Sequence, residues 1–88
     1  MFLDKPRGFM QLEVFIRPSE MPKHTGGAHS TTYADVKAGL LPPPVKLGRR
    51  SSGWIAREVA AVQQARIAGR SENEIRELVT QLIKLRTV

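Results

Sequence analysis

The clearest pattern of hydrophobic and polar positions lies near the end of the chain. Apolar residues recur there at the spacing of one helix face, and they are Ile75, Leu78, Val79, Leu82 and Ile83. Ser71 and Glu74 have the S-x-x-E spacing of a capping box, in which each side chain accepts the backbone N–H of the other residue. The pattern predicts a helix from about Glu72 to Arg86.

An apolar face also recurs just upstream, in an alanine-rich stretch. Ile55, Val59 and Val62 lie at positions i, i+4 and i+7, which is the spacing of one side of a helix. We predict a helix over residues 55–68, closed by Gly69. This helix is expected to be the scaffold on which the rest of the domain packs.

The first half of the chain predicts a short strand followed by two short helices. Polar and apolar residues alternate from Gln11 to Arg17, as they do in a strand. Ser19 is a candidate N-cap for a short helix that ends at the turn 25–27. A second helix is predicted over 28–38, with Gly39 as its C-cap. Two short helices joined by a glycine-bearing turn form a helix-turn-helix candidate.

The segment that joins the two helical parts has the order of residues that a DNA-binding wing requires. Pro42–Pro44 cannot continue a helix and favour an extended path, and Val45–Leu47 alternate as a half-buried strand does. A glycine turn follows with Arg49 and Arg50 at its tip, and the chain returns to Trp54, whose large ring can anchor the hairpin on a core. Taken alone, these residues fit a basic surface loop on any small domain equally well.

Length and composition restrict the function classes. With 88 residues the chain forms one small domain, which has a limited core and little room for a buried catalytic cleft. No nucleophile, base and acid occur at a recognisable spacing, so an enzyme is disfavoured. The absence of cysteine excludes disulfides and thiolate zinc sites, and His24 and His29 are five residues apart without an acidic cluster. We therefore predict no metal and no other cofactor.

The charge of the chain is concentrated in one part of it. The formal net charge is +6, and residues 41–70 carry six basic residues and one acidic residue, a net of +5. Residues 1–40 have five basic and four acidic residues, and residues 71–88 have three of each. This clustering favours a surface that binds a polyanion over charge that only solubilises the protein. No apolar run approaches the ~20 residues of a membrane span and no signal-peptide pattern occurs, so we expect a cytoplasmic, nucleoid-associated protein without a membrane partner.

The helix over 28–38 and the hairpin supply the candidate DNA contacts. In a helix-turn-helix the second helix lies in the major groove, and polar side chains near its N-terminus reach bases and phosphates. The candidate contact residues are His29, Ser30, Thr31 and Lys37 in the helix and Lys46, Arg49, Arg50 and Ser51 in the hairpin. The two arginines would enter the minor groove, where negative potential attracts guanidinium groups, and their alternative role is solubility.

Three stretches of the chain resemble one family. They read S-T-x-Y-x-x-V-K-x-G from Ser30, P-x-P-V-K-L-G-x-R-x-x-G-W from Pro42 and E-V at Glu58. Together they resemble the AlpA-type phage regulators and excisionases, small winged-helix proteins related to the DNA-binding domain of MerR. The resemblance covers about Ile16–Ala68. It implies an accessory DNA-binding protein that regulates prophage or genomic-island genes, or that bends attachment-site DNA so that an integrase excises the element.

The candidate recognition helix departs from the pattern of this family. Thr32 and Asp35 stand where family members usually carry apolar residues. Asp35 would face either the core or the phosphates, and neither suits a carboxylate without a basic partner. Tyr33 and Trp54 are assigned to the core.

These observations predict a mainly α winged helix-turn-helix with a small β-hairpin, MerR-like or excisionase-like, and an additional C-terminal helix. The expected divisions are a flexible arm at 1–10, the DNA-binding domain at 11–70 and an amphipathic helix at 71–88 that packs on the core or forms a homodimer. The expected partner is double-stranded DNA, with an integrase or RNA polymerase as further candidates. The alternative function is a protein-interaction module, an antitoxin or adaptor, that uses the apolar stripe of the last helix.

Overall fold

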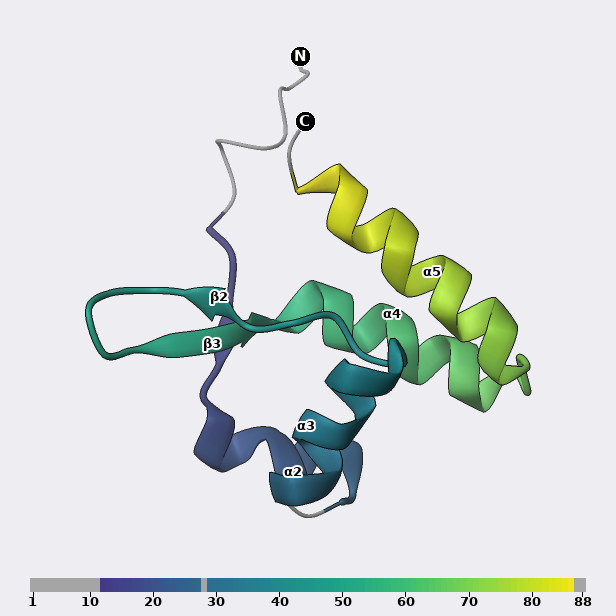
Figure 1. Cartoon of the computed structure of the whole chain (residues 1–88), viewed down its shortest axis with the longest axis horizontal. Coiled ribbons are helices and arrows are strands. Elements are labelled where there is room, and N and C mark those ends of the chain that lie inside the picture. Colours follow the sequence, from purple (N-terminus) through teal and green to yellow (C-terminus); the bar gives the residue numbers. More distant parts are fainter. Residues whose placement is uncertain (1–11, 28, 87–88) are drawn as a thin grey trace.

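The computed structural model describes residues 12–27 and 29–86 and shows in them a three-stranded antiparallel sheet beside four α-helices (Figure 1). In chain order the elements are β1 (Phe15–Ile16), the 3-10 helix η1 (Pro18–Glu20), α2 (Met21–Thr25), α3 (His29–Ala38), β2 (Val45–Lys46), β3 (Ser52–Ile55), α4 (Ala56–Ile67) and α5 (Glu72–Leu85). The arm predicted at 1–10 lies outside the described residues. The fold is mainly helical, as the sequence predicts, and it is compatible with a small helix-turn-helix domain.

β3 is the central strand of the sheet and pairs antiparallel with both of its neighbours. β2 and β3 form the predicted hairpin, with Val45 opposite Gly53. On the other side of β3, Phe15 lies opposite Ile55. The strand predicted at 11–17 is therefore present but covers two residues, and it adds a third strand to the predicted hairpin.

The scaffold helix begins one residue later than its apolar spacing predicts. Ile55 fits the spacing of that helix, but it belongs to β3, and α4 begins at Ala56. The backbone of Ile55 is extended, with φ −71° and ψ 118°, and the N–H of Ala56 donates to the carbonyl of Val14 at 2.8 Å. The helix prediction at Ile55 is wrong because pairing with β1 keeps this residue in the sheet.

A 3-10 turn and a short helix form the first half of the predicted helix-turn-helix. Ser19 lies inside η1 and caps neither η1 nor α2, so its prediction as an N-cap is wrong. Pro18 stands in the first turn of η1, where its missing N–H is harmless. α2 ends at Gly26, which has a left-handed φ of 79° and donates its N–H to the carbonyl of Pro22 at 2.8 Å. The predicted glycine turn after this helix is confirmed.

α3 ends in a Schellman motif that directs the chain into the core. The N–H of Gly39 donates to the carbonyl of Val36 at 3.1 Å, and the N–H of Leu40 donates to that of Asp35 at 2.8 Å. Gly39 has a φ of 80°, as its predicted role as a C-cap requires. Because Leu40 and Leu41 are buried directly afterwards, the end of the helix also supplies part of the core.

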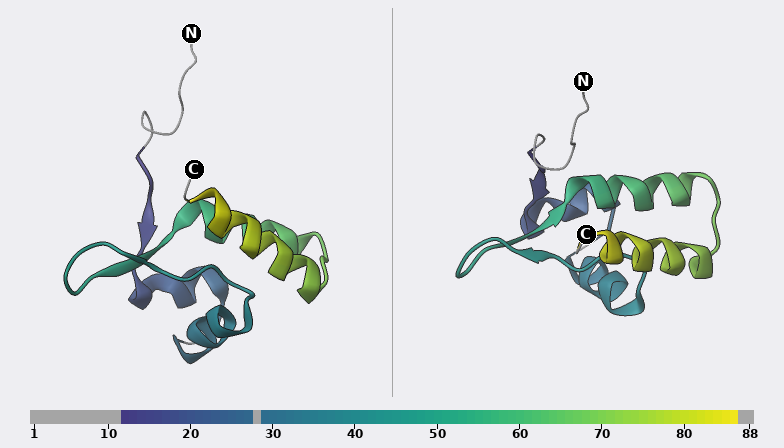
Figure 2. Two further views of the ribbon diagram at one scale, coloured as in Figure 1. Left: turned by 45° about the horizontal axis from the view of Figure 1, so that its top comes forward. Right: turned by 90° about the horizontal axis from the view of Figure 1, so that it is seen from above.

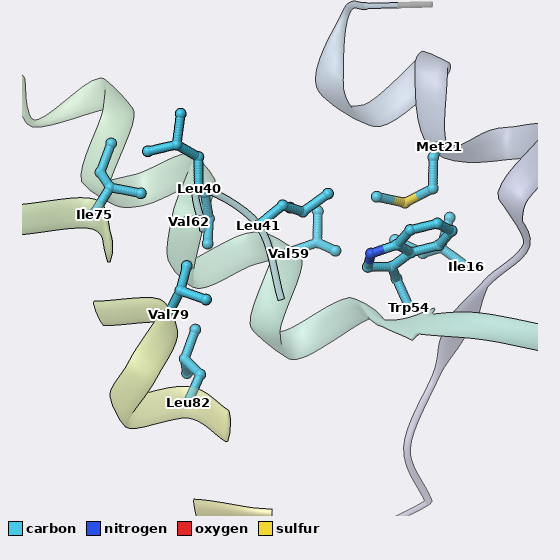
Figure 3. Packing of buried hydrophobic residues seen from close by; sticks show 10 residues of the cluster. All are labelled: Ile16, Met21, Leu40, Leu41, Trp54, Val59, Val62, Ile75, Val79 and Leu82. Atoms are coloured by element: carbon cyan, nitrogen blue, oxygen red, sulfur yellow. The ribbon is translucent and has the colours of Figure 1, made fainter. Parts of the chain in front are cut away.

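The core lies between α4 and α5 and extends to the sheet (Figure 3). Its buried apolar residues are Ile16, Met21, Leu40, Leu41, Trp54, Val59, Val62, Ile75, Val79 and Leu82. α4 contributes Val59 and Val62 from the face that the sequence predicts to be apolar. α4 and α5 run side by side after a short turn (Figure 2). The scaffold role predicted for α4 therefore agrees with its position between the sheet and α5.

α5 begins and ends close to where its sequence pattern predicts. The hydroxyl of Ser71 accepts the N–H of Glu74 at 3.2 Å, and the carboxylate of Glu74 accepts the N–H of Ser71 at 2.9 Å, which confirms the capping box. Its buried face carries Ile75, Val79 and Leu82. Leu78 is half-buried and Ile83 is 38% exposed, so they form the margins of the apolar stripe. Most of this stripe packs inside the chain itself.

Candidate nucleic-acid interface

The β2–β3 hairpin, residues 45–55, projects from the helical part of the molecule (Figures 1 and 2). Its turn is closed by the carbonyl of Ser51, which accepts the N–H of Leu47 at 2.9 Å. Arg49 and Arg50 are exposed in the turn. The hairpin therefore presents two guanidinium groups away from the core, at the positions that the sequence predicts for them.

The other two hairpin residues that were predicted to contact DNA differ in exposure. Lys46 is exposed on β2, so its ammonium group is accessible to a phosphate. Ser51 is half-buried, and its carbonyl is occupied by the turn. Of these two residues, Lys46 has the geometry better suited to an external contact.

Trp54 fixes the base of the hairpin to the rest of the molecule. Its side chain is fully buried, and the indole N–H donates to the carbonyl of Pro42 at 2.8 Å. Its ring meets that of Tyr33 edge-on, with centroids 5.5 Å apart and an interplanar angle of 65°. The prediction of Trp54 as a core anchor is confirmed. The prediction of Tyr33 as a core residue is wrong, because α3 leaves this side chain 48% exposed.

α3 presents Ser30 and Lys37 on one face, since they are seven residues apart and both are exposed. Thr31 is also exposed. A Cβ on Gly27 would lie 3.0 Å from Cγ2 of Thr31, so the turn before α3 comes close to this threonine. His29 is the first helical residue, but its side chain lies outside the described part of the structure, as does all of residue 28.

The inner side of α3 contains both residues that depart from the family pattern. Thr32 is buried, whereas Asp35 is half-buried and lines a cleft of about 380 Å³ between α2, α3 and α4. Arg66 and His24 line the same cleft, as do Thr31 and the acidic Glu72. Asp35 therefore lies neither in the apolar core nor on the face of Ser30.

Ion pairs neutralise arginines away from α3 and the hairpin. In residues 12–27 and 29–86 the pairs are Arg57–Glu13 (3.1 Å), Arg70–Glu74 (3.8 Å), Arg76–Glu72 (3.6 Å) and Arg86–Glu58 (2.5 Å). In the same described residues, no ion pair involves Lys37, Lys46, Arg49 or Arg50. Within the part of the chain that the structure describes, the charges of Lys37 and of the hairpin residues Lys46, Arg49 and Arg50 are therefore not compensated by an ion pair, and neither are those of Arg17, Lys23, Arg66 and the acidic Asp35 of α3.

Two arginines near the ends of α5, Arg76 and Arg86, donate to backbone carbonyls beside α3 and the hairpin. The sequence patterns did not indicate either of them. Arg86 donates to both carboxylate oxygens of Glu58 and, at 2.8 Å, to the carbonyl of Pro43. Its hydrogen bonds to Glu58 raise the pKa of the Arg86 guanidinium above its usual value, despite partial burial. The Nε of Arg76 donates to the carbonyl of Ala38 at 2.9 Å. Glu58 stood in the E-V motif, but no local pattern indicated a partner 28 residues away.

Among residues 12–27 and 29–86, no three His, Cys, Asp or Glu side chains are grouped so that they could hold a metal ion. None of the helices in these ranges combines the length and the hydropathy that crossing a membrane requires.

A family model matches the part of the chain that contains the hairpin and α3. The model describes the Prophage CP4-57 regulatory protein (AlpA), and it matches residues 14–67, from just before β1 to the end of α4. The chain belongs to the AlpA family. The resemblance noted in the sequence is thereby confirmed, and the description of the matching model names a regulatory protein. α5 lies beyond the part of the chain that matches the AlpA model.

A phage protein shares much of the AlpA segment. The chain is 40% identical over 58 residues to "Uncharacterized protein ORF88" of Enterobacteria phage P4, and the alignment covers 66% of each chain. The aligned segment thus spans just under two thirds of the relative. No solved structure gives a significant match. The family and this relative both connect the chain with phages.

Proposed function

We propose that this AlpA-family chain is a sequence-specific DNA-binding regulator of a prophage or genomic island, with a MerR-like winged helix-turn-helix within residues 11–70. α3 would lie in the major groove and the hairpin in the adjacent minor groove. The observation that carries this proposal is the projecting hairpin, on which Lys46, Arg49 and Arg50 are exposed and no ion pair among the described residues compensates their charge. Cations that are unpaired in the free protein can displace counterions from DNA without first breaking contacts inside the protein.

On α3 the contacts are assigned to the N-terminal turn and to one exposed lysine. Ser30 and Thr31 are exposed in the first turn, where hydroxyl and backbone N–H groups suit phosphates and base edges. Lys37 lies on the same face as Ser30 and supplies a charge for the phosphate backbone. His29 is kept as a candidate contact at the start of the helix.

In the hairpin the contacts are assigned mainly to the turn. Arg49 and Arg50 are the side chains for the minor groove, because they are exposed at the tip and their charge is free. Lys46 supplies a phosphate contact along β2. Ser51 is a secondary candidate because it is half-buried.

Two biological roles are compatible with this mode of DNA binding. A transcriptional regulator would bind at a promoter and act on RNA polymerase, whereas an excisionase would bind and bend attachment-site DNA beside an integrase. The regulatory description of the AlpA family favours the first role. A footprint that lies in a promoter and not in an attachment site would support regulation.

The alternative of an antitoxin or adaptor depends on a free apolar stripe on the last helix. Ile75, Val79 and Leu82 are instead buried against the rest of the chain. The interaction-module hypothesis therefore gains no support from the surface that motivated it.

The experiment compares two double variants that change the net charge equally. Arg49→Ala with Arg50→Ala removes two unpaired hairpin charges, and Arg57→Ala with Arg70→Ala removes two charges that are paired with glutamates. We expect the hairpin variant to weaken binding to promoter or attachment-site duplexes by up to about a few kcal/mol. The control variant should weaken it much less. If both arginines contact phosphates, the slope of log K against log salt should become shallower by about 2.

The measurement is a fluorescence anisotropy titration at several salt concentrations, with a scrambled duplex as the control for sequence specificity. Equal losses in the two variants would mean that only net charge matters. Unchanged binding by the hairpin variant would show that the hairpin does not contact DNA.

A further inference from the structure

We propose that α5 holds the hairpin and α3 at a fixed relative orientation, with Arg86 as the positioning residue for the hairpin and Arg76 for α3. This inference rests on the proposed DNA-binding function, because it assigns α5 an effect on DNA affinity without a contact to DNA. It concerns a helix that lies outside the AlpA match. α5 lies on the far side of the molecule from the tip of the hairpin (Figures 1 and 2).

Arg86 joins three elements through one guanidinium group. Its Nε and Nη2 donate to the two carboxylate oxygens of Glu58 at 2.9 and 2.5 Å, and Nη2 also donates to the carbonyl of Pro43 at 2.8 Å. The side chain of Glu58 is 1% exposed and that of Arg86 is 21% exposed. Because a guanidinium group is planar and its donors are fixed in a fork, these bonds define the direction of Pro43 relative to α4.

The hydrogen bond to the carbonyl of Pro43 is important because proline has no backbone N–H. Pro42–Pro44 lead directly into β2, and none of these residues has a backbone N–H that could bind the segment to its surroundings. Only their carbonyls can form backbone hydrogen bonds. The carbonyl of Pro42 is held by Trp54 and that of Pro43 by Arg86. The incoming strand of the hairpin is therefore positioned from β3 on one side and from α5 on the other.

Arg76 holds the other end of the same connection. Its Nε donates to the carbonyl of Ala38, the last residue of α3. A Cβ built on Gly39 would lie 3.5 Å from Cγ of Arg76, so the aliphatic part of the arginine covers the helix end. A cation at this end also complements the negative pole of the helix dipole.

The connection between α3 and β2 is thus fixed at both ends by one rigid element. Arg76 and Arg86 are ten residues apart, which corresponds to about 15 Å along a helix axis. α5 is anchored to α4 by Ile75, Val79 and Leu82, so the helix from which both arginines extend is fixed to the core. The angle between α3 and the hairpin, which must match the spacing of two DNA grooves, follows from this arrangement.

The test is a double-mutant cycle between Arg86 and the tip of the hairpin. Arg86→Met keeps an aliphatic side chain but removes the donors, and Arg70→Met removes a charge from an exposed ion pair as the matched control. Arg86→Lys keeps the charge and loses the fork, so it also serves as the variant with the milder effect on folding. Affinities are measured at a temperature at which circular dichroism shows each variant to be folded.

We expect Arg86→Met to weaken DNA binding by about fivefold or more, in the range typical of coupling between sites. Arg86→Lys should lose part of this affinity, and Arg70→Met should lose little. In the background of Arg49→Ala and Arg50→Ala, the effect of Arg86→Met should nearly disappear, because Arg86 acts through the hairpin. Full additivity of the two changes, or wild-type affinity of Arg86→Met, would overturn the proposal.

A readout without DNA separates this proposal from the proposed function. Residual dipolar couplings of backbone amides report the orientation of the hairpin relative to α4, and Arg86→Met should change those of residues 45–55. If the wild-type protein fails to bind DNA while these couplings change, the DNA-binding function is wrong and the positioning role stands. Couplings that stay the same in the variant would reject the positioning role whatever the DNA result.

Discussion

Single side chains determine how the hairpin is attached to the rest of the molecule. Trp54 is buried in β3, binds the carbonyl of Pro42 and touches the ring of Tyr33. Its burial was predictable, because a large aromatic ring that follows a basic turn suits an anchor. Its hydrogen-bond partner was not, since Pro42 lies on another segment and carries no sequence signal for a donor. For Tyr33, residue type alone pointed to the core, but its position on α3 leaves it half-exposed.

The bond between Trp54 and Pro42 gives a prediction at the scale of one residue. Trp54→Phe removes the indole N–H, so the carbonyl of Pro42 loses its donor, and the smaller ring also leaves a cavity in the core. We expect the free energy of unfolding, measured in urea, to fall by about 1–3 kcal/mol from the lost hydrogen bond, with a further loss from the cavity. The control Tyr33→Phe changes a half-exposed ring and should shift the value by less than about 0.5 kcal/mol. Similar losses in both variants would argue against a special role for the indole N–H.

For the helices and strands, sequence patterns that involve residues within one turn of each other predicted the structure best. The capping box at the start of α5 and the glycines that end α3 and α4 work through contacts between near neighbours, and the structure shows them where the sequence placed them. Ser19 and Ile55 carry equally plausible local signals. They were misassigned because Pro18 opens η1 and because β1 pairs with Ile55, and the second of these causes is a tertiary contact.

The two serines at predicted helix starts form a matched pair for experiment. Ser71→Ala removes the hydroxyl that accepts the N–H of Glu74 and should lower the melting temperature, with a loss of about 1 kcal/mol in the free energy of unfolding. Ser19→Ala removes a hydroxyl that caps no helix and should leave both quantities nearly unchanged. Thermal unfolding followed by circular dichroism compares them directly. A larger loss of unfolding free energy in Ser19→Ala than in Ser71→Ala would contradict the assignment of Ser71, and not Ser19, as a helix cap.

For the whole molecule, the order of the elements was largely predictable but the contacts between distant ones were not. Length, charge clustering and apolar periodicity indicated a small helical domain with a basic hairpin. The candidate contact residues came from the same local patterns, and the structure shows most of the described ones to be exposed. The ion pair of Arg86 with Glu58 spans 28 residues and follows from packing alone, so no periodic pattern reveals it.

Burial of the apolar stripe on α5 leads to a prediction about oligomeric state. Because Ile75, Val79 and Leu82 are used in the core of one chain, these three residues are not available as a homodimer seam in the free protein. We expect sedimentation equilibrium without DNA to give a mass near 9.8 kDa over a wide concentration range. A concentration-dependent dimer that is lost when exposed Ile83 is replaced by a charged residue would contradict this expectation.

The burial of Trp54 also has an optical consequence. It is the one tryptophan of the chain, it lies in the strand between the hairpin tip and α4, and its ring is in contact with a tyrosine of α3. Its emission therefore originates from the junction of the two elements assigned to DNA. A shift in this emission on adding a duplex would report movement at that junction in the native protein, without any attached dye.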